Sequence, residues 1–252
     1  MLRPLATLST VVLLAWGANV RAADDQPKDI IAKAIKAHGG EESLTKNKAG
    51  TSKGKGKITL PGVGEVEFTQ DSAHMLPDKF KESIEMTVMG MNISVVTLVN
   101  GDKATLLLNG KEMDLPDAAK DALKNAGHML KVGKLVPLLK EKEYELSIIG
   151  EEKVEGKPAI GIRISAKDKK DISAYFNKET NLLAKIEIRT NDPISQKEIN
   201  EERIVLEYMK NKDGVPVPKK VIVKHDGEKF LEIEMSEVEL LEKLDESEFK
   251  KP

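Results

Sequence analysis

Cysteine is absent from this sequence, and aromatic residues are scarce. None of the 252 residues is cysteine, and phenylalanine, tryptophan and tyrosine together make up 4% of the chain. The absence of thiols excludes disulfide bonds, thiolate metal sites and cysteine nucleophiles. It also excludes acylation of a cysteine at a processed N-terminus, so we expect that the chain is not itself a lipoprotein and is soluble after processing.

Histidine is also rare. The sequence contains only His38, His74, His128 and His225, which lie far apart and form neither an H-x-H nor an H-E-x-x-H pattern. A metal site is therefore not expected, because the ligands of such sites are often close in sequence. His225 falls on the apolar side of an expected strand, where a half-buried histidine bonded to the backbone is the simplest interpretation.

Motifs of nucleotide-binding sites are missing as well. The Gly-Lys-Gly-Lys segment at 54–57 leads into an expected strand and not into a helix, so it does not resemble a P-loop. We predict no catalytic residue and no cofactor, and an enzyme is the weaker hypothesis. A hydrolase with paired carboxylates stays open as an alternative, because the chain has 42 acidic residues.

Neither basic nor acidic side chains are concentrated in one part of the sequence. The 40 basic and 42 acidic side chains are interspersed along the whole sequence. A protein that binds nucleic acid is expected to carry a basic stripe. The charge pattern therefore predicts an ordinary solvated surface and no nucleic-acid partner.

Long apolar runs occur only at the N-terminus. A basic start, the apolar run from Leu5 to Ala18 and the small residues up to Ala22 are typical of a secretory signal peptide. We predict cleavage near Ala22 and a single domain at 23–252, located outside the cytosol. An uncleaved N-terminal anchor is the alternative.

Two segments have helical periodicity. Residues 24–37 place Ile30, Ile31, Ala34 and Ile35 on one face and end at a glycine pair. Residues 114–142 carry apolar stripes interrupted by glycine and proline, which predicts two short helices with a bend, the first ending at Gly127.

Most of the remaining chain alternates between apolar and polar residues. The alternation predicts about five strands between residues 53 and 113 and about seven between 143 and 235, separated by turn signals such as Asn109-Gly110. One sheet of this width must curl. We therefore predict a mainly β (α+β) fold: a curved antiparallel half-barrel of about 11–12 strands, with the N-terminal helix and the mid-chain helices covering its concave face.

Several short motifs resemble one bacterial superfamily. They are Ala-His-Gly-Gly at 37–40, a Y-F-N-K-E-T-N-L-L hairpin at 175–183, a tyrosine-to-proline turn at 208–218 and an L-D-x-x-x-F ending at 244–249. With the alternating strands and the mid-chain helices, they resemble the periplasmic lipoprotein-carrier superfamily, which includes LolA-like, LolB-like and LppX-type proteins. The resemblance implies a periplasmic half-barrel that holds acyl chains in an apolar cavity beneath a helical lid.

The cavity residues predicted from side-chain alternation come from both halves of the sheet and from the mid-chain helices. They are Val66, Phe68, Ile84, Met86, Val88, Ile160, Ile162, Ile186 and Ile188 on strands, and Leu123, Leu130, Leu135 and Leu138 on the lid. Ordinary core packing is the alternative for each of them. The expected partners are an acyl lipid or lipoprotein and a membrane-associated donor or acceptor protein, with the chain itself a monomer.

One feature of the superfamily has no assigned counterpart. The lipoprotein carrier uses an inward arginine to hold its lid, whereas Arg163 and Arg189 fall on the polar sides of their strands, and Arg203 is not assigned to this role. General lipid binding is therefore the function predicted first. An envelope sensor or protein-interaction module with the same fold, without enzymatic activity, is the alternative.

Overall fold

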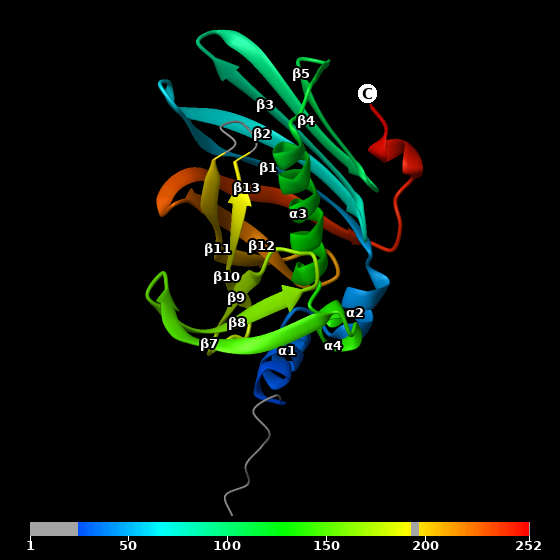
Figure 1. Ribbon diagram of the computed structural model, residues 1–252, viewed down its shortest axis with the longest axis vertical. Coiled ribbons are helices and arrows are strands. Elements are labelled where there is room, and N and C mark those ends of the chain that lie inside the picture. The colour runs from blue at the N-terminus through cyan, green and yellow to red at the C-terminus, as the bar shows by residue number, and fades with distance from the viewer. Residues whose placement is uncertain (1–24, 193–196, 252) are drawn as a thin grey trace, which may run out of the picture.

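A single antiparallel sheet forms most of the molecule (Figure 1). The computed structural model describes residues 25–192 and 197–251, so the predicted signal peptide lies outside the described residues. In these two segments the sheet has thirteen strands in the order β6-β5-β4-β3-β2-β1-β13-β12-β11-β10-β9-β8-β7. The predicted curved half-barrel is confirmed.

The strands form two meanders that meet where β1 pairs with β13. The first meander comprises β1 (Ala49–Leu60), β2 (Gly64–Met75), β3 (Lys79–Val88), β4 (Met91–Asn100), β5 (Lys103–Leu108) and β6 (Lys111–Met113). The second comprises β7 (Tyr144–Val154), β8 (Lys157–Ala166), β9 (Ile172–Asn177), β10 (Leu183–Asn191), β11 (Glu198–Lys210), β12 (Pro216–His225) and β13 (Glu228–Leu241). Strand β6 has only three residues, which is too few for an alternating pattern to predict it.

The N-terminal helix α1 (Asp25–Ala37) lies where the sequence predicts it. Its apolar stripe is buried, and Ile31 and Ala34 have no exposed surface. The helix ends at Gly39 and Gly40, both in left-handed conformations, and the Gly40 N–H donates to the Ile35 carbonyl at 2.9 Å. The glycine pair therefore terminates the helix by the usual αL route.

The mid-chain helices differ from the prediction at one boundary. Helix α3 (Asp117–Gly133) continues through Gly127, so the expected end at this residue is wrong. A helix tolerates one interior glycine when its other residues favour helix formation. The bend comes instead before α4 (Val136–Lys140), where Leu135 has a φ of 61°.

Two short elements were not predicted. Helix α2 (Glu41–Lys46) follows α1 directly, and the 3₁₀ helix η1 (Glu246–Phe249) packs near β3 and β4. Among the described helices, none has the length and apolarity needed to cross a membrane.

Helix α3 links the two free edges of the sheet. It follows edge strand β6, and the chain then passes through α4 into the other edge strand, β7. It contacts β10 on one side and β4 and β5 on the other, and Figure 1 shows it lying across the face of the curved sheet. The predicted helical cover of the concave face is therefore present.

Three glycines in β1 allow close approach between the central strands. A Cβ atom at Gly56 would lie 2.1 Å from the Glu232 carbonyl oxygen, and one at Gly50 would lie 2.7 Å from the Glu239 carbonyl oxygen. Gly54 has the same orientation, at 2.9 Å from the Glu234 carbonyl oxygen. The Gly-Lys-Gly-Lys segment therefore lies inside a strand, with glycines on the concave face and exposed lysines on the other.

Candidate ligand-binding face

The strand register places one row of side chains across most of the concave face. Residues directly opposite each other in neighbouring strands point to the same side of a sheet. From β2 to β8, the row is Val66, Ile58, Leu231, Val223, Arg203, Ile186, Ala174 and Ile162. The only charged side chain in this row is Arg203.

One half of the face is filled by the helices. Buried residues of β8, β9 and β10 pack against α1, α3 and α4 in the main hydrophobic core. In this core Ile162 and Ile172 have no exposed surface, while Val132 and Leu135 are 1% exposed. This half of the concave face is packed as an ordinary protein interior.

The other half is apolar but less covered. Ile58, Val66, Phe68 and Ile233 are buried there, and side chains around them keep part of their surface exposed. These partly exposed residues are Leu60, Ile84, Met86, Val88, Val221, Phe230, Leu231 and Met235. This group, from β1, β2, β3, β12 and β13, is called the open apolar wall below.

Eleven of the thirteen predicted cavity residues divide between these two environments. Val66, Phe68, Ile84, Met86 and Val88 belong to the open apolar wall. The others in the second half of the chain belong to or pack against the main core: Leu135, Leu138, Ile160, Ile162, Ile186 and Ile188. Leu123 and Leu130 on α3 are partly buried. A role of these residues in ligand binding stays a prediction.

A charged group interrupts the apolar face between its two halves. The Arg203 Nε donates to Glu201 Oε1 at 2.6 Å, and the other oxygen of Glu201 lies 3.7 Å from His225 Nε2. The His225 ring stacks on Phe230, with centroids 4.0 Å apart. Burial alone would raise the pKa of Glu201, but Arg203 and His225 outweigh it and lower the pKa to about 2.

A second carboxylate faces this group across the hollow of the sheet. Glu82 on β3 lies within electrostatic range of Arg203 and Glu201, and the Gln70 amide donates to it. Four strands separate β3 from β11 in the sheet order, so this interaction crosses the concave interior. Gln70, Glu82, Glu201, Arg203 and His225 are called the inner charge cluster below.

Sequence reasoning missed this cluster. The partner expected for His225 was backbone, whereas the structure gives it a carboxylate, so that interpretation is wrong. Ile204, the neighbour of Arg203 in its strand, packs with Val154 and Tyr175 on the opposite face of the sheet. Because successive side chains of a strand point to opposite faces, Arg203 points inward. Alternation shows that a strand has two faces but does not show which one is inside.

Ser52 stands in a G-x-S-x-G spacing, from Gly50 to Gly54, that sequence reasoning also missed. In hydrolases this spacing places the nucleophile on a strand-to-helix turn. Here the segment lies within β1, and the Ser52 Oγ is 2.7 Å from the Ser72 Oγ. In the described part of the chain the Ser52 hydroxyl has no hydrogen bond to a histidine, so the spacing forms no nucleophile elbow here.

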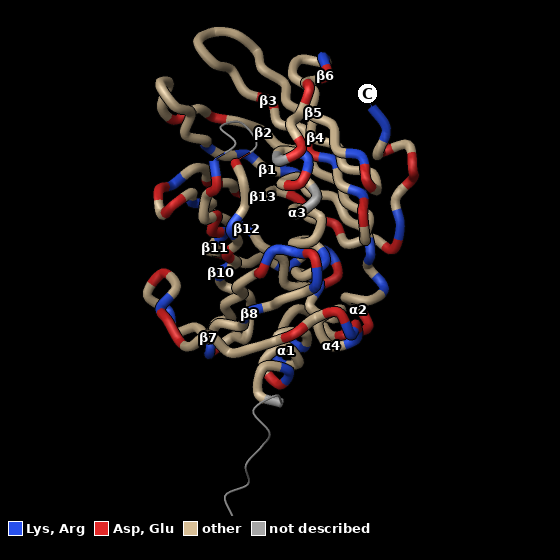
Figure 2. The backbone as a smooth tube through the Cα atoms, viewed as in Figure 1, with Lys and Arg blue, Asp and Glu red and all other residues tan. Residues whose placement is uncertain are grey.

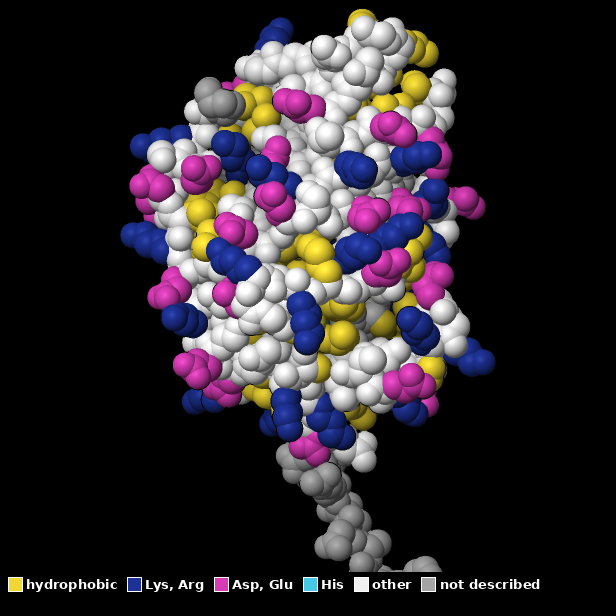
Figure 3. Space-filling model, turned by 180° about the vertical axis from the view of Figure 1, so that it is seen from behind, with side chains coloured by type: hydrophobic (Ala, Val, Ile, Leu, Met, Phe, Trp, Pro, Cys, Tyr) yellow, Lys and Arg dark blue, Asp and Glu magenta, His cyan; other side chains and the backbone are white. Residues whose placement is uncertain are grey.

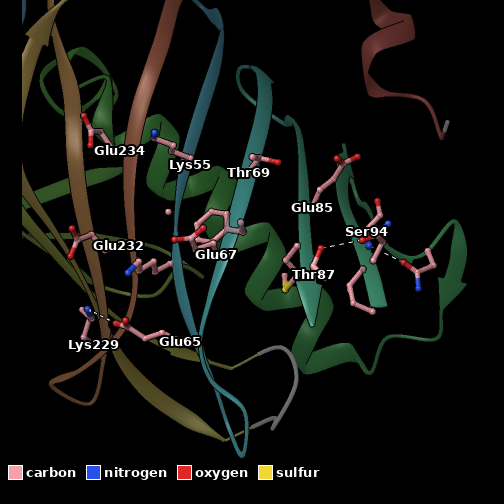
Figure 4. A pocket seen from close by; sticks show the side chains of 17 residues that line it. Lys55, Glu65, Glu67, Thr69, Glu85, Thr87, Ser94, Lys229, Glu232 and Glu234 are labelled. Atoms are coloured by element: carbon pink, nitrogen blue, oxygen red, sulfur yellow. Dashed lines mark hydrogen bonds and ion pairs between the residues drawn. The ribbon is translucent and has the colours of Figure 1, made fainter. Parts of the chain in front are cut away.

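The opposite face of the first meander carries a polar hollow of about 970 Å³ (Figure 4). Most of its lining is lysine, glutamate and small polar residues, with Phe68, Met86 and Ile93 also among them, and the Lys229 ammonium lies 2.8 Å from the Glu65 carboxylate. Such exposed pairs contribute little to stability. Figures 2 and 3 show the same mixture of charges over the molecule, which suits a solvated surface. Within 25–192 and 197–251, no group of three or more histidine or acidic residues is placed to hold a metal ion.

Similarity to known proteins is found in structure and not in sequence. No protein-family model matches the chain, and no curated protein matches its sequence. A DUF1329 family protein from Desulfovibrio piger superposes with a TM-score of 0.55 at 15% identity, covering 89% of this chain and 97% of that chain.

Two further solved structures agree. A LolA superfamily protein from Nitrosomonas europaea has a TM-score of 0.54 at 11% identity, covering 89% of this chain and 97% of its own. A putative outer membrane lipoprotein-sorting protein domain from Vibrio parahaemolyticus has a TM-score of 0.51 at 11% identity, with coverages of 90% and 97%. The chain therefore has the fold of the LolA-like proteins, over almost their whole length.

Proposed function

We propose that this chain is a soluble periplasmic binder or carrier of lipids or lipoproteins, and not an enzyme. The observation that carries the proposal is the open apolar wall, whose side chains stay partly exposed on the concave face of a half-barrel. An exposed apolar surface in a concave site is the usual mark of an apolar ligand. The fold shared with a lipoprotein-sorting domain supports the same function.

The energetics suit an acyl chain. Each buried methylene contributes about 0.8 kcal/mol, so a long acyl chain would gain roughly 10 kcal/mol before the costs of binding. Met86 and Met235 on the wall are flexible and polarisable, so they can adapt to chains of different shape. The proposed site therefore needs no charged anchor to hold its ligand.

Helix α3 is the proposed lid. Its C-terminal part is fixed in the core through Met129 and Val132, whereas Leu123, closer to the N-terminal end, is only partly buried. Lys131 adds an anchor at the C-terminal end, with its ammonium 2.8 Å from Glu143. Opening at the N-terminal end of α3 would expose the interior together with the buried Ala119, and would leave the main core in place.

The first test changes the open apolar wall. We expect Met86→Asp to reduce displacement of a fluorescent acyl probe at least about tenfold, because a charge within the wall must be desolvated by the ligand. Thr87→Asp is the matched control, since Thr87 is the next residue of β3, is exposed, and by strand alternation points to the opposite face. Equal effects of the two substitutions would contradict the proposed site.

A second test uses the protein in its native state. Native mass spectrometry of the chain purified from a bacterial envelope should reveal a co-purifying mass that organic solvent removes. The alternative function, a protein-interaction module, draws support from the β3–β4 turn, where Met89 and Met91 are 77% and 60% exposed. A bound protein that survives lipid extraction, with no acyl mass, would favour this alternative.

A further inference from the structure

The inner charge cluster holds two carboxyl groups, Glu82 and Glu201, and one guanidinium group, Arg203. Glu201 is ionised, because its pKa lies at about 2, and its contact with the Arg203 Nε at 2.6 Å compensates the guanidinium. Glu82 adds a second carboxyl, whose pKa is raised above its usual value, mainly by burial, although Arg203 and Gln70 act in the opposite direction. With Arg203 already paired, an anion placed here would meet a neutral or negative site.

The same cluster offers hydrogen-bonding groups that are not used within the protein. The buried Gln70 Oε1 has no hydrogen-bond partner among the described residues. Arg203 uses only its Nε in a hydrogen bond to these residues, so its terminal N–H groups remain as donors. The cluster thus offers a ligand one acceptor, Gln70 Oε1, and the terminal N–H donors of Arg203. A buried polar atom without a hydrogen bond costs free energy, so binding of a ligand that supplies the missing bond is favourable.

The cluster also lies at the point where a bound chain would stop. Arg203 is the charged member of the side-chain row, between Val223, which leads towards the open apolar wall, and Ile186 in the main core. The core beyond it is closed, since Ile162 and Ile188 are at most 2% exposed. A ligand that fills the open apolar wall therefore brings one of its ends to the cluster.

We propose that the inner charge cluster selects acyl ligands whose polar group is uncharged and carries both a donor and an acceptor, such as an amide or an alcohol, and rejects acyl anions. This inference rests on the proposed function, and it adds the class of ligand. The carbonyl oxygen of an amide accepts from Arg203, and its N–H donates to Gln70 Oε1 or Glu82. A carboxylate has no donor to offer to Gln70 Oε1 and is repelled by the ionised Glu201.

The experiment compares three twelve-carbon probes at pH 7.5: dodecanoate below its critical micelle concentration, and dodecanamide and 1-dodecanol below their aqueous solubility limits. We expect the amide and the alcohol to displace a neutral fluorescent acyl probe at least about tenfold more effectively than the carboxylate, because dodecanoate leaves Gln70 Oε1 without a donor and meets the negative charge of Glu201. Glu82→Gln removes the ionisable carboxyl without changing shape, and should narrow the difference by improving dodecanoate binding. Gln70→Leu should weaken binding of dodecanamide more than binding of dodecanoate.

The matched control is Glu85→Gln, because Glu85 lies on the same strand as Glu82 but is exposed and, by strand alternation, points to the opposite face. It should leave the difference between the probes unchanged. Equal binding of dodecanoate and dodecanamide would overturn the selection, and so would a difference that Glu82→Gln and Gln70→Leu leave intact. Failure of all three probes to bind the wild-type protein would overturn the proposed function as well. Thermal unfolding of each variant shows that the compared proteins are folded.

Discussion

At the scale of single residues, His38 has a structural role at the end of α1. The His38 Nδ1 lies 2.8 Å from the Ala34 carbonyl, and the Leu183 N–H donates to its Nε2 at 3.4 Å. The Tyr208 hydroxyl donates to the Leu183 carbonyl at 2.7 Å. This arrangement joins the end of α1 to β10 and β11, and it gives the Ala-His-Gly-Gly motif at 37–40 a structural role.

His74 makes the stability of the protein depend on pH. Burial, with a smaller effect from Lys134, lowers the pKa of His74 to about 4. The unfolded chain therefore takes up this proton near pH 6.5, while the folded chain resists it. This group therefore does not lower the free energy of unfolding above pH 6.5. As the pH falls from 6.5 towards 4, the free energy of unfolding decreases, because the unfolded chain takes up a proton that the folded chain does not.

We expect wild-type protein to lose on the order of 2 kcal/mol more stability than His74→Gln between pH 7 and pH 4.5. Urea unfolding at both pH values measures this difference, and comparison with the variant removes the contribution of the carboxylates. Parallel pH profiles for the two proteins would show that His74 is protonated as easily in the folded state as in the unfolded state.

At the scale of elements, α3 combines a firm end with a weaker middle. Gly127 lies in its interior, where a Cβ atom would meet nothing within 4 Å. An interior glycine costs a helix about 0.5–1 kcal/mol relative to alanine, because it leaves more backbone freedom to be lost on folding. The element proposed as a lid therefore carries a destabilising residue that its packing does not require.

Gly127→Ala should raise the free energy of unfolding by about 0.5–1 kcal/mol. Under the proposed function it should also slow the exchange of a bound acyl probe, because local opening of α3 becomes less frequent. Denaturant unfolding and stopped-flow displacement measure the two effects. Gly156→Ala is the contrasting variant: Gly156 has a φ of 78° in a turn, so the same substitution there should destabilise.

At the scale of the whole molecule, the pairing of β1 with β13 holds two meanders in one sheet. We expect Gly56→Ala to destabilise the protein by more than about 3 kcal/mol, because the added Cβ would lie 2.1 Å from a backbone oxygen of β13. Lys57→Ala, an exposed neighbour, should change stability by less than about 0.5 kcal/mol. Chemical unfolding compares the two, and similar values would mean that the strands can separate at low cost.

Much of this fold could be predicted from the sequence, because alternation and turn signals are local properties. The strand positions, the first helix and the curved antiparallel sheet follow from them. The direction of Arg203 could not, since its strand has apolar residues on both faces, with Ile199 and Ile204 both buried. The distinction between open wall and closed core also depends on where α3 and α4 lie: Ile162 and Ile84 look alike in the sequence, yet only Ile84 keeps exposed surface. For this reason Ile162→Asp would place a charge in the closed core and destabilise the fold, whereas a change at the open apolar wall can report on ligand binding.

The path of the chain around α3 limits how the molecule can open. The helix is tethered at both ends to strands at the sheet margins, with only residues 114–116 between β6 and α3. A helix connected at both ends cannot rotate away from the sheet about one end alone. Any widening of the entrance must draw the β6 margin along with the helix, so access to the interior is coupled to bending of the sheet itself.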